Sequence, residues 1–184
     1  AADNLTKVSL ELGGKAPNIV FADSDLEQAV AGAMMGIFYN QGQVCCAGSR
    51  LFVEESVKDE FVTKLSERAG RIAVGDPMNK ATQMGPQVSE EQLNRIKGYV
   101  DIAREEGATV VAGGQAPQLE GAFKKGYFFS PTIFSEVKNS MRVAQEEIFG
   151  PVTTVIPASS LEDAIQIVNG VRYGLSAAIY TQNV

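Results

Sequence analysis

Strand-like segments alternate with amphipathic helical segments along this chain, and this alternation restricts the fold more than any other feature. The expected strands are residues 8–12, 18–21, 51–53, 109–111, 127–129, 132–134, 152–156 and 177–180. The expected helices, recognised by apolar residues at helical spacing, are residues 24–42, 56–75, 89–107 and 160–170. Strands separated by helices of this length are typical of an α/β fold. We therefore predict three α/β/α layers around a mostly parallel sheet that helices cover on both faces.

Polar residues and a proline mark several boundaries of these elements. Ser24 with Glu27, and Ser89 with Gln92, have the spacing of a capping box, in which each side chain bonds to an otherwise unpaired backbone N–H. Pro131 separates two apolar runs and has no N–H to donate to a strand ladder. The segment around Pro131 is therefore expected to be an edge strand or an irregular one.

The composition fits one globular domain, or one domain with a remnant of another. The chain has 184 residues, of which 45% are hydrophobic, so a substantial core can form. Its 16 basic and 22 acidic residues give a net charge of −6. Because no basic cluster occurs, neither nucleic acid nor an anionic membrane is an expected partner. The apolar runs are too short to span a bilayer, and the opening residues do not resemble a signal peptide.

The only two cysteines, Cys45 and Cys46, are adjacent in a stretch between a predicted helix and a predicted strand. Small residues around them would let a substrate approach closely, so Cys45 is a candidate nucleophile, with a buried apolar side chain as the alternative. Two adjacent thiols form no disulfide framework, which favours a reducing compartment such as the cytoplasm. The absence of histidine excludes Ser-His-Asp and Cys-His arrangements and the usual zinc sites, so we expect no metal. The base for Cys45 would then be a carboxylate, a lysine or a group from outside the chain.

Two acidic features adjoin predicted strands or turns. Glu11 lies at the end of a predicted strand, and Cys45 follows it by 45 − 11 = 34 positions, which leaves room for one strand and one helix. A glutamate near a thiol can act as a general base on the thiol or on water. Residues 145–151 carry two acids before an Ile-Phe-Gly-Pro turn, where a carboxylate could bind sugar hydroxyls and the aromatic could pack beside a flat ring. From the residues alone, a surface glutamate and a solvated turn remain the alternatives.

Three stretches together closely resemble the signatures of the NAD(P)-dependent aldehyde dehydrogenase superfamily. They are Leu-Glu-Leu-Gly-Gly-Lys at 10–15, Gly-Gln-Val-Cys-Cys-Ala-Gly-Ser-Arg at 42–50 and Glu-Glu-Ile-Phe-Gly-Pro at 146–151. Their order and spacing also match, and residues 85–87 and 173–175 extend the resemblance over essentially the whole chain. The combination is specific, although no single motif carries it.

The resemblance implies a chemistry for these residues. Cys45 would attack the aldehyde and carry a thiohemiacetal and then a thioester, with Cys46 as its neighbour. Glu11 would activate the water that hydrolyses the thioester to a carboxylic acid. NAD or NADP would accept the hydride. Six residues match positions at the cofactor: Glu147 at the nicotinamide ribose, Phe149 beside it, the backbone of Leu12 and Gly13 next to the nicotinamide, and Gln92 and Arg95 at the ribose in some members.

The resemblance also implies a domain organisation. Residues 1–12 would be the terminal strand of the cofactor-binding domain, and residues 13–184 would be the catalytic domain, truncated at its C-terminal end. The expected partner is a small-molecule aldehyde, and the full-length parent would be a homodimer or homotetramer. Because most of the cofactor site would lie outside this chain, we expect the chain alone to have little or no dehydrogenase activity.

Two alternative functions stay open at this point. An acylating relative would pass the thioester to coenzyme A and would not need Glu11 as a base. A non-catalytic, thiol-sensing module of the same fold would need no catalytic set at all. The presence of Glu11, Cys45 and Glu147 in one chain favours the hydrolytic dehydrogenase over both.

Overall fold

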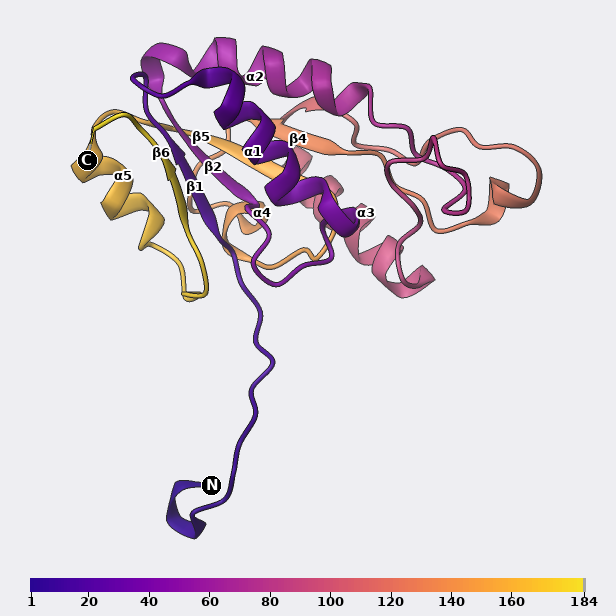
Figure 1. The fold of residues 1–184 in the computed structure, drawn as a ribbon, viewed down its shortest axis with the longest axis horizontal. Coiled ribbons are helices and arrows are strands. Elements are labelled where there is room, and N and C mark those ends of the chain that lie inside the picture. The colour runs from indigo at the N-terminus through magenta and orange to yellow at the C-terminus, as the bar shows by residue number, and fades with distance from the viewer. Residues whose placement is uncertain (184) are drawn as a thin grey trace.

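Six strands form one sheet, in the order β3-β4-β5-β2-β1-β6, in a computed structural model that describes residues 1–183 (Figure 1). The strands are β1 (Pro17–Val20), β2 (Arg50–Glu54), β3 (Thr109–Ala112), β4 (Thr132–Ser135), β5 (Val152–Ala158) and β6 (Ala178–Tyr180). Neighbouring strands are parallel except for β3 and β4, which are antiparallel. The mostly parallel sheet predicted from the sequence is therefore confirmed.

Helices cover both faces of this sheet. They are α1 (Leu26–Phe38), α2 (Glu55–Gly70), α3 (Glu90–Glu105), α4 (Arg142–Gln145) and α5 (Leu161–Val168), with short 3₁₀ turns η1 (Ala2–Asn4), η2 (Tyr39–Gly42) and η3 (Gly121–Lys125) in the connections. One cluster of buried apolar side chains includes residues of α1 and α2, and a second includes residues of α3, α4 and α5. The three-layer α/β/α architecture is thus also confirmed.

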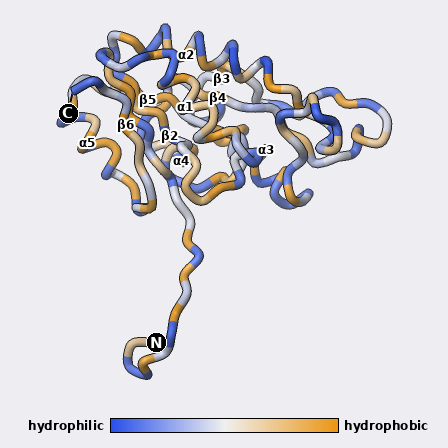
Figure 2. The backbone as a smooth tube through the Cα atoms, in the orientation of Figure 1, coloured by the Kyte–Doolittle hydropathy of each residue, from blue (hydrophilic) through white to orange (hydrophobic). Residues whose placement is uncertain are grey.

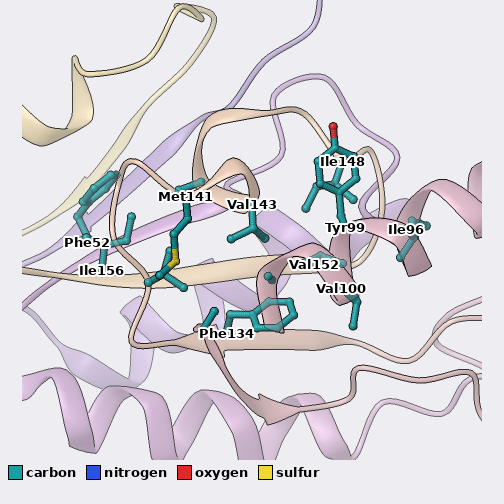
Figure 3. Close-up of a cluster of buried hydrophobic side chains, with 14 of the residues drawn as sticks. Phe52, Ile96, Tyr99, Val100, Phe134, Met141, Val143, Ile148, Val152 and Ile156 are labelled. Carbon is teal, nitrogen blue, oxygen red and sulfur yellow. The ribbon is translucent and has the colours of Figure 1, made fainter. Parts of the chain in front are cut away.

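Strand β2 shows how one apolar run serves both layers. Leu51 and Val53 belong to the cluster under α1 and α2, whereas Phe52 between them belongs to the cluster under α3 and α5. All three side chains are fully buried, and burial of each contributes about 1.5–3 kcal/mol to stability. Figure 3 shows Phe52 and Ile156 from the sheet beside Met141, which precedes α4. Figure 2 shows the strands as largely hydrophobic and the outer turns of α2 as hydrophilic.

The two predicted capping boxes have different outcomes. The side chain of Ser89 caps α3 by accepting from the Gln92 N–H at 3.1 Å, as predicted. At α1 the predicted Ser24 cap is wrong, because Asp25 is the N-cap and accepts from the Gln28 N–H at 3.1 Å. The side chain of Glu27 instead forms ion pairs with α2 residues. A carboxylate at the N-cap also interacts favourably with the helix dipole, which gives Asp25 an advantage over a serine.

Three strand predictions differ from the structure, beginning with residues 8–12 and the segment after Pro131. Residues 8–12 form no strand and run away from the body as an exposed, extended segment (Figure 1). A strand needs a neighbouring backbone for its ladder hydrogen bonds, and this segment has none within residues 1–183. The segment after Pro131, expected to be an edge strand or an irregular one, is β4. It lies inside the sheet between β3 and β5, so the edge alternative is wrong, but its register with β3 shifts between Val110 and Ala112, as an irregular strand would. Pro131 precedes β4, so its missing N–H lies outside the ladder, which begins where Thr132 N–H donates to Pro151 O at 2.8 Å.

One helix boundary and a third strand prediction also differ from the structure. The helix expected over 56–75 begins at Glu55 and ends at Gly70, before the Gly-Asp-Pro turn that was expected to stop it. Residues 127–129 are not a strand, although Phe128 and Phe129 are buried. Their apolar character reflects packing into the core and not pairing with a neighbouring strand.

Candidate active site

Three stretches far apart in the sequence meet at one cleft of about 630 Å³. Residues 10–15 come shortly before β1, residues 42–49 directly before β2 and residues 146–151 directly before β5. These strands are parallel neighbours, and their register aligns their starts at the same edge of the sheet. The cleft therefore lies at the amino ends of the strands. The expectation that Glu11 follows a strand, at a carboxyl end, is wrong.

The cleft brings together all eight residues that the sequence singled out. They are Cys45, Glu11, Glu147, Phe149, Leu12, Gly13, Gln92 and Arg95. Val88, Ser89 and Glu91 also line the cleft and were not identified as site residues. The capping box marked Ser89 as a helix start. Because the same box ends at Gln92, a candidate site residue, it could have placed the first turn of α3 near the site.

Cys45 lies in a loop that packs tightly against two other motifs. The loop follows three residues with positive φ: Asn40, Gln41 and Gly42. A Cβ atom at Gly42 would collide with the carbonyl of Gly150, and a Cβ atom at Gly14 would collide with the carbonyl of Cys45. Glycine at these positions permits the close approach of backbones that joins the three stretches. Both Cys45 and Cys46 are exposed free thiols, so the buried alternative for Cys45 does not hold.

Glu11 lines the same cleft from the extended N-terminal segment. Its side chain is exposed, and the segment that carries it has no strand pairing within residues 1–183. β1 and α1 lie between Glu11 and Cys45, as the spacing of 34 residues predicted. The position of Glu11 relative to Cys45 is thus set by Gly13 and Gly14, where the segment joins the body of the protein.

Glu147 is held against the glycine pair by its own carboxylate. Its Oε1 accepts a hydrogen bond from the Gly14 N–H at 3.0 Å, and a Cβ atom at Gly13 would collide with Oε2. Two residues further on, Phe149 has φ 61°, an unusual value for an aromatic residue, and its side chain is 37% exposed. A carboxylate and an aromatic ring are thus presented side by side in the cleft.

Gln92 and Arg95 reach the cleft from the first half of α3. The Gln92 amide Nε2 donates to Ile148 O at 2.9 Å and to Phe149 O at 2.7 Å. An Arg95 guanidinium nitrogen donates to Glu147 O at 2.6 Å. Both side chains therefore line the cleft while bonding to the backbone that carries Glu147 and Phe149.

Beneath the glycine pair lies a buried lysine that the sequence analysis did not identify as functional. Lys15 is almost completely buried, and its Nζ has no hydrogen-bond partner within residues 1–183. Burial and the positive charge of Arg50 lower the pKa of Lys15 to about 7, against the opposing effect of Glu147 and Glu146. Arg50 is also buried, which lowers its pKa to about 10, and its Nε donates to Lys15 O at 2.9 Å. The sequence feature that could have drawn attention to Lys15 is its position between the glycine pair and a predicted buried strand.

Neither a metal cluster nor a membrane helix occurs in the part of the chain that the structure describes. Residues 1–183 contain no group of three or more His, Cys, Asp or Glu side chains arranged to hold a metal ion. Across the same residues, every helix is too short or too polar to cross a bilayer.

The whole chain matches the model of the aldehyde dehydrogenase family, over residues 1–184. It is 51% identical over 184 residues to an aldehyde dehydrogenase of Aspergillus niger, and 46% identical over 184 residues to a betaine aldehyde dehydrogenase of Brucella anthropi. The matches include all of this chain but only 36% and 38% of those two proteins. The chain thus spans little more than a third of their length.

Solved structures give the same result. A betaine aldehyde dehydrogenase from Staphylococcus aureus, solved in complex with NAD+, superposes with a TM-score of 0.94 at 44% identity. A mutant of an aldehyde dehydrogenase from Bacillus cereus superposes with a TM-score of 0.93 at 46% identity. These matches cover 99% and 100% of this chain, and 36% of each solved chain.

Proposed function

This chain belongs to the aldehyde dehydrogenase family, and from that premise we propose that it is the catalytic part of an NAD(P)-dependent enzyme that oxidises a small-molecule aldehyde to a carboxylic acid. One observation carries the proposal. A single cleft gathers a free thiol, a nearby carboxylate, and a second carboxylate beside an aromatic ring: Cys45, Glu11, Glu147 and Phe149. Each residue type suits one step of the reaction.

Cys45 is the nucleophile in this proposal. Its thiolate forms a C–S bond to the aldehyde carbon, and the carbonyl π electrons move to oxygen to give a tetrahedral adduct. Loss of hydride from that adduct restores the C=O bond and leaves a thioester on Cys45. Glu11 then takes a proton from water as the water attacks the thioester, which releases the carboxylic acid and regenerates the thiolate. No step requires a histidine, and the sequence contains none.

The residues of the cleft fit a nicotinamide nucleotide. With Oε1 of Glu147 bonded to the Gly14 N–H, Oε2 keeps lone pairs to accept from ribose hydroxyls. The half-exposed ring of Phe149 offers an apolar surface beside it. A volume of about 630 Å³ also lies within the range of cofactor sites. When bound, NAD or NADP supplies the hydride acceptor, and this chain's own groups orient it: Glu147, Phe149 and the backbone of Leu12 and Gly13.

The proposal extends to the domain organisation. Residues 1–12, of which 6–12 are extended and unpaired here, would contribute the terminal strand of the cofactor-binding domain, and residues 13–184 would be the catalytic domain. The exposed alternate apolar side chains of Val8, Leu10 and Leu12 support this, since they suit a strand with one buried face. The whole protein would be a homodimer or homotetramer. The free thiols of Cys45 and Cys46 suit a reducing compartment such as the cytoplasm.

The proposal can be tested by alkylation and acylation of the thiols. The chain is treated with iodoacetamide across pH and, separately, with an active ester, and mass spectrometry locates the modified cysteine. We expect alkylation of Cys45 to exceed that of Cys46, and stoichiometric acylation of Cys45. Loss of the acyl group should slow at least about 100-fold in Glu11→Gln, the range expected for loss of a general base.

Glu90→Gln is the matched control, because it neutralises an exposed carboxylate of α3 that does not line the cleft. It should leave acylation and deacylation unchanged. Thioester loss that is equally fast in Glu11→Gln but accelerated by coenzyme A would support the acylating alternative. A Cys45 that reacts no faster than Cys46 and takes no acyl group would support the thiol-sensing module and contradict the proposed function.

A further inference from the structure

The segment with Glu147 and Phe149 rests on one face of α3. The side chains that contact it are Gln92, Arg95 and Tyr99, spaced three and four residues apart, which places them in a row along the helix. Ile148 from the same segment is buried in the cluster under α3. Figure 3 shows Tyr99 and Ile148 at the same end of this cluster, with the hydroxyl oxygen of Tyr99 pointing out of it.

The backbone of the segment is fixed at three consecutive carbonyl groups. Arg95 donates to Glu147 O, and Gln92 donates to both Ile148 O and Phe149 O. These contacts hold Phe149 at φ 61°, a conformation that a non-glycine residue keeps only where its surroundings determine it. The row on α3 therefore acts as a template for the backbone.

A carboxylate immediately before Glu147 is fixed even more firmly. The Tyr99 hydroxyl donates to Glu146 Oε2 at 2.6 Å. Arg142 forms a bidentate interaction with the same carboxylate: its Nε donates to Oε1 at 2.8 Å and a terminal guanidinium nitrogen donates to Oε2 at 3.0 Å. The guanidinium groups of Arg142 and Arg95 also lie 5.8 and 5.2 Å from the centre of the Tyr99 ring. Arginine and hydroxyl donors on one carboxylate form strong, directional hydrogen bonds.

The charges around this cluster keep Glu146 ionised. The hydrogen bonds from Arg142 and Tyr99 lower the pKa of Glu146 to about 2. Burial, together with the hydrogen bond to Glu146, raises the pKa of Tyr99, which therefore keeps its proton to donate. The arrangement stays intact throughout the neutral range.

Glu146 and Glu147 are adjacent in extended backbone, so their side chains leave the chain in opposite directions. Glu146 has φ −110° and ψ 143°, and successive side chains point to opposite sides in this conformation. The Glu146 carboxylate meets Tyr99 and Arg142, whereas the Glu147 carboxylate meets the Gly14 N–H at 3.0 Å. Fixing one carboxylate on α3 therefore fixes the direction of the other into the cleft.

We propose that Tyr99 and Arg142 are positioning residues that act through Glu146 to hold Glu147 and Phe149 in the arrangement that receives the nicotinamide ribose. This inference depends on the proposed cofactor role of Glu147, and neither positioning residue lines the cleft. Gln92 and Arg95 complete the same template through the backbone. The position of Glu147 thus depends on side chains that never touch the cofactor.

The Gly14 amide gives a direct measure of how Glu147 is held, because its N–H donates to the Glu147 carboxylate. We would record amide NMR spectra and exchange rates of the chain with Tyr99→Phe, which removes one oxygen and keeps the ring. Glu147→Gln shows where the Gly14 resonance lies when its acceptor has lost its negative charge. Tyr99→Phe should move the Gly14 resonance toward that of Glu147→Gln and raise its exchange rate roughly tenfold, the order expected when a charge-assisted hydrogen bond is loosened.

Tyr180→Phe is the matched control, since it removes a tyrosine oxygen from β6, at the other end of the sheet order from β3. It should leave the Gly14 resonance unchanged. If Tyr99→Phe fails to fold, Glu146→Gln tests the same cluster, because it changes the carboxylate and retains its two partners, Tyr99 and Arg142. A Gly14 resonance that responds to Glu147→Gln but to neither cluster variant overturns the proposal.

A second measurement separates positioning from the proposed function itself. In the dehydrogenase that contains this chain, Tyr99→Phe should raise the KM for NAD(P) severalfold and lower kcat less, because a ground-state contact is loosened. Acylation of Cys45 by an active ester needs no cofactor and should not change. A responsive Gly14 amide in a protein that oxidises no aldehyde would support the positioning role and refute only the proposed function. An unchanged KM with an active enzyme would refute the positioning role.

Discussion

Replacing Lys15 by methionine should remove a pH dependence from the stability of the fold. Lys15 is 2% exposed, and its Nζ has no hydrogen-bond partner among residues 1–183. Burial and the charge of Arg50 lower its pKa from 10.5 to about 7, and Glu147 and Glu146 oppose this shift only in part. Methionine is unbranched and adaptable, so it removes the titrating amine while retaining most of the packing.

The sign of the effect follows from proton binding. Between the folded pKa of about 7 and the unfolded value of 10.5, the unfolded chain binds a proton that the folded chain lacks. Stability therefore rises with pH in this window. One pKa unit corresponds to about 1.4 kcal/mol, so raising the pH from about 7 to about 9 should add about 2 kcal/mol to the free energy of unfolding through Lys15 alone.

Urea unfolding of the wild type and of Lys15→Met at these two pH values measures this contribution. Subtracting the two pH responses isolates the contribution of Lys15, because every other titratable group is present in both proteins. Lys97→Met, at an exposed lysine of α3, is the matched control and should respond to pH as the wild type does. If the wild type and Lys15→Met gain the same stability between the two pH values, the argument that Lys15 is buried with a lowered pKa is refuted.

Two further substitutions test the loops around the cleft. Ser89→Ala should lower the free energy of unfolding by about 1 kcal/mol, because the N-cap of α3 loses its hydrogen bond to the Gln92 N–H, and chemical denaturation measures the loss. Gly14→Ala should lower it by about 1–3 kcal/mol and abolish the preferential alkylation of Cys45, because the new Cβ collides with the Cys45 carbonyl. Gly98→Ala, which meets open space within α3, should instead raise stability by about 0.5–1 kcal/mol. A stable Gly14→Ala with unchanged thiol selectivity would contradict the packing argument.

The sequence was a good guide wherever local signals and packing agree. The apolar run of β2 and the stripes of the long helices predicted the layers, because a two-sided sheet needs buried residues on both faces of its strands. The prediction was wrong where pairing depends on a distant neighbour. The alternation at residues 8–12 is that of a strand, yet no backbone within residues 1–183 pairs with it. The proline rule misplaced β4 for a related reason, since Pro131 lies one residue outside the ladder.

The candidate site was predicted as a set of residues but not as an arrangement. All eight candidates line one cleft. Six belong to motifs that precede neighbouring parallel strands, whereas Gln92 and Arg95 come from the N-terminal half of α3. The sequence could not show that Lys15 is buried beneath the glycine pair, since lysine is usually exposed. Nor could it show that Gln92 and Arg95 bond to the backbone of residues 147–149, because that contact depends on where α3 lies relative to β5.

The direction of α3 follows from the single antiparallel pair in the sheet. α1 leads into β2, whose start lies at the cleft, so α1 presents its C-terminal end there. β3 runs antiparallel to β4, so it starts at the opposite edge, and α3, which leads into it, presents its N-terminal half to the cleft instead. That reversal brings Ser89, Gln92 and Arg95 to the site. The free N–H groups and the positive dipole end of α3 thus face the cleft at the amino ends of the strands. A helix that leads into a parallel strand would place its negative end there. The antiparallel strand therefore brings to the cleft the side chains that bond to the backbone of residues 147–149.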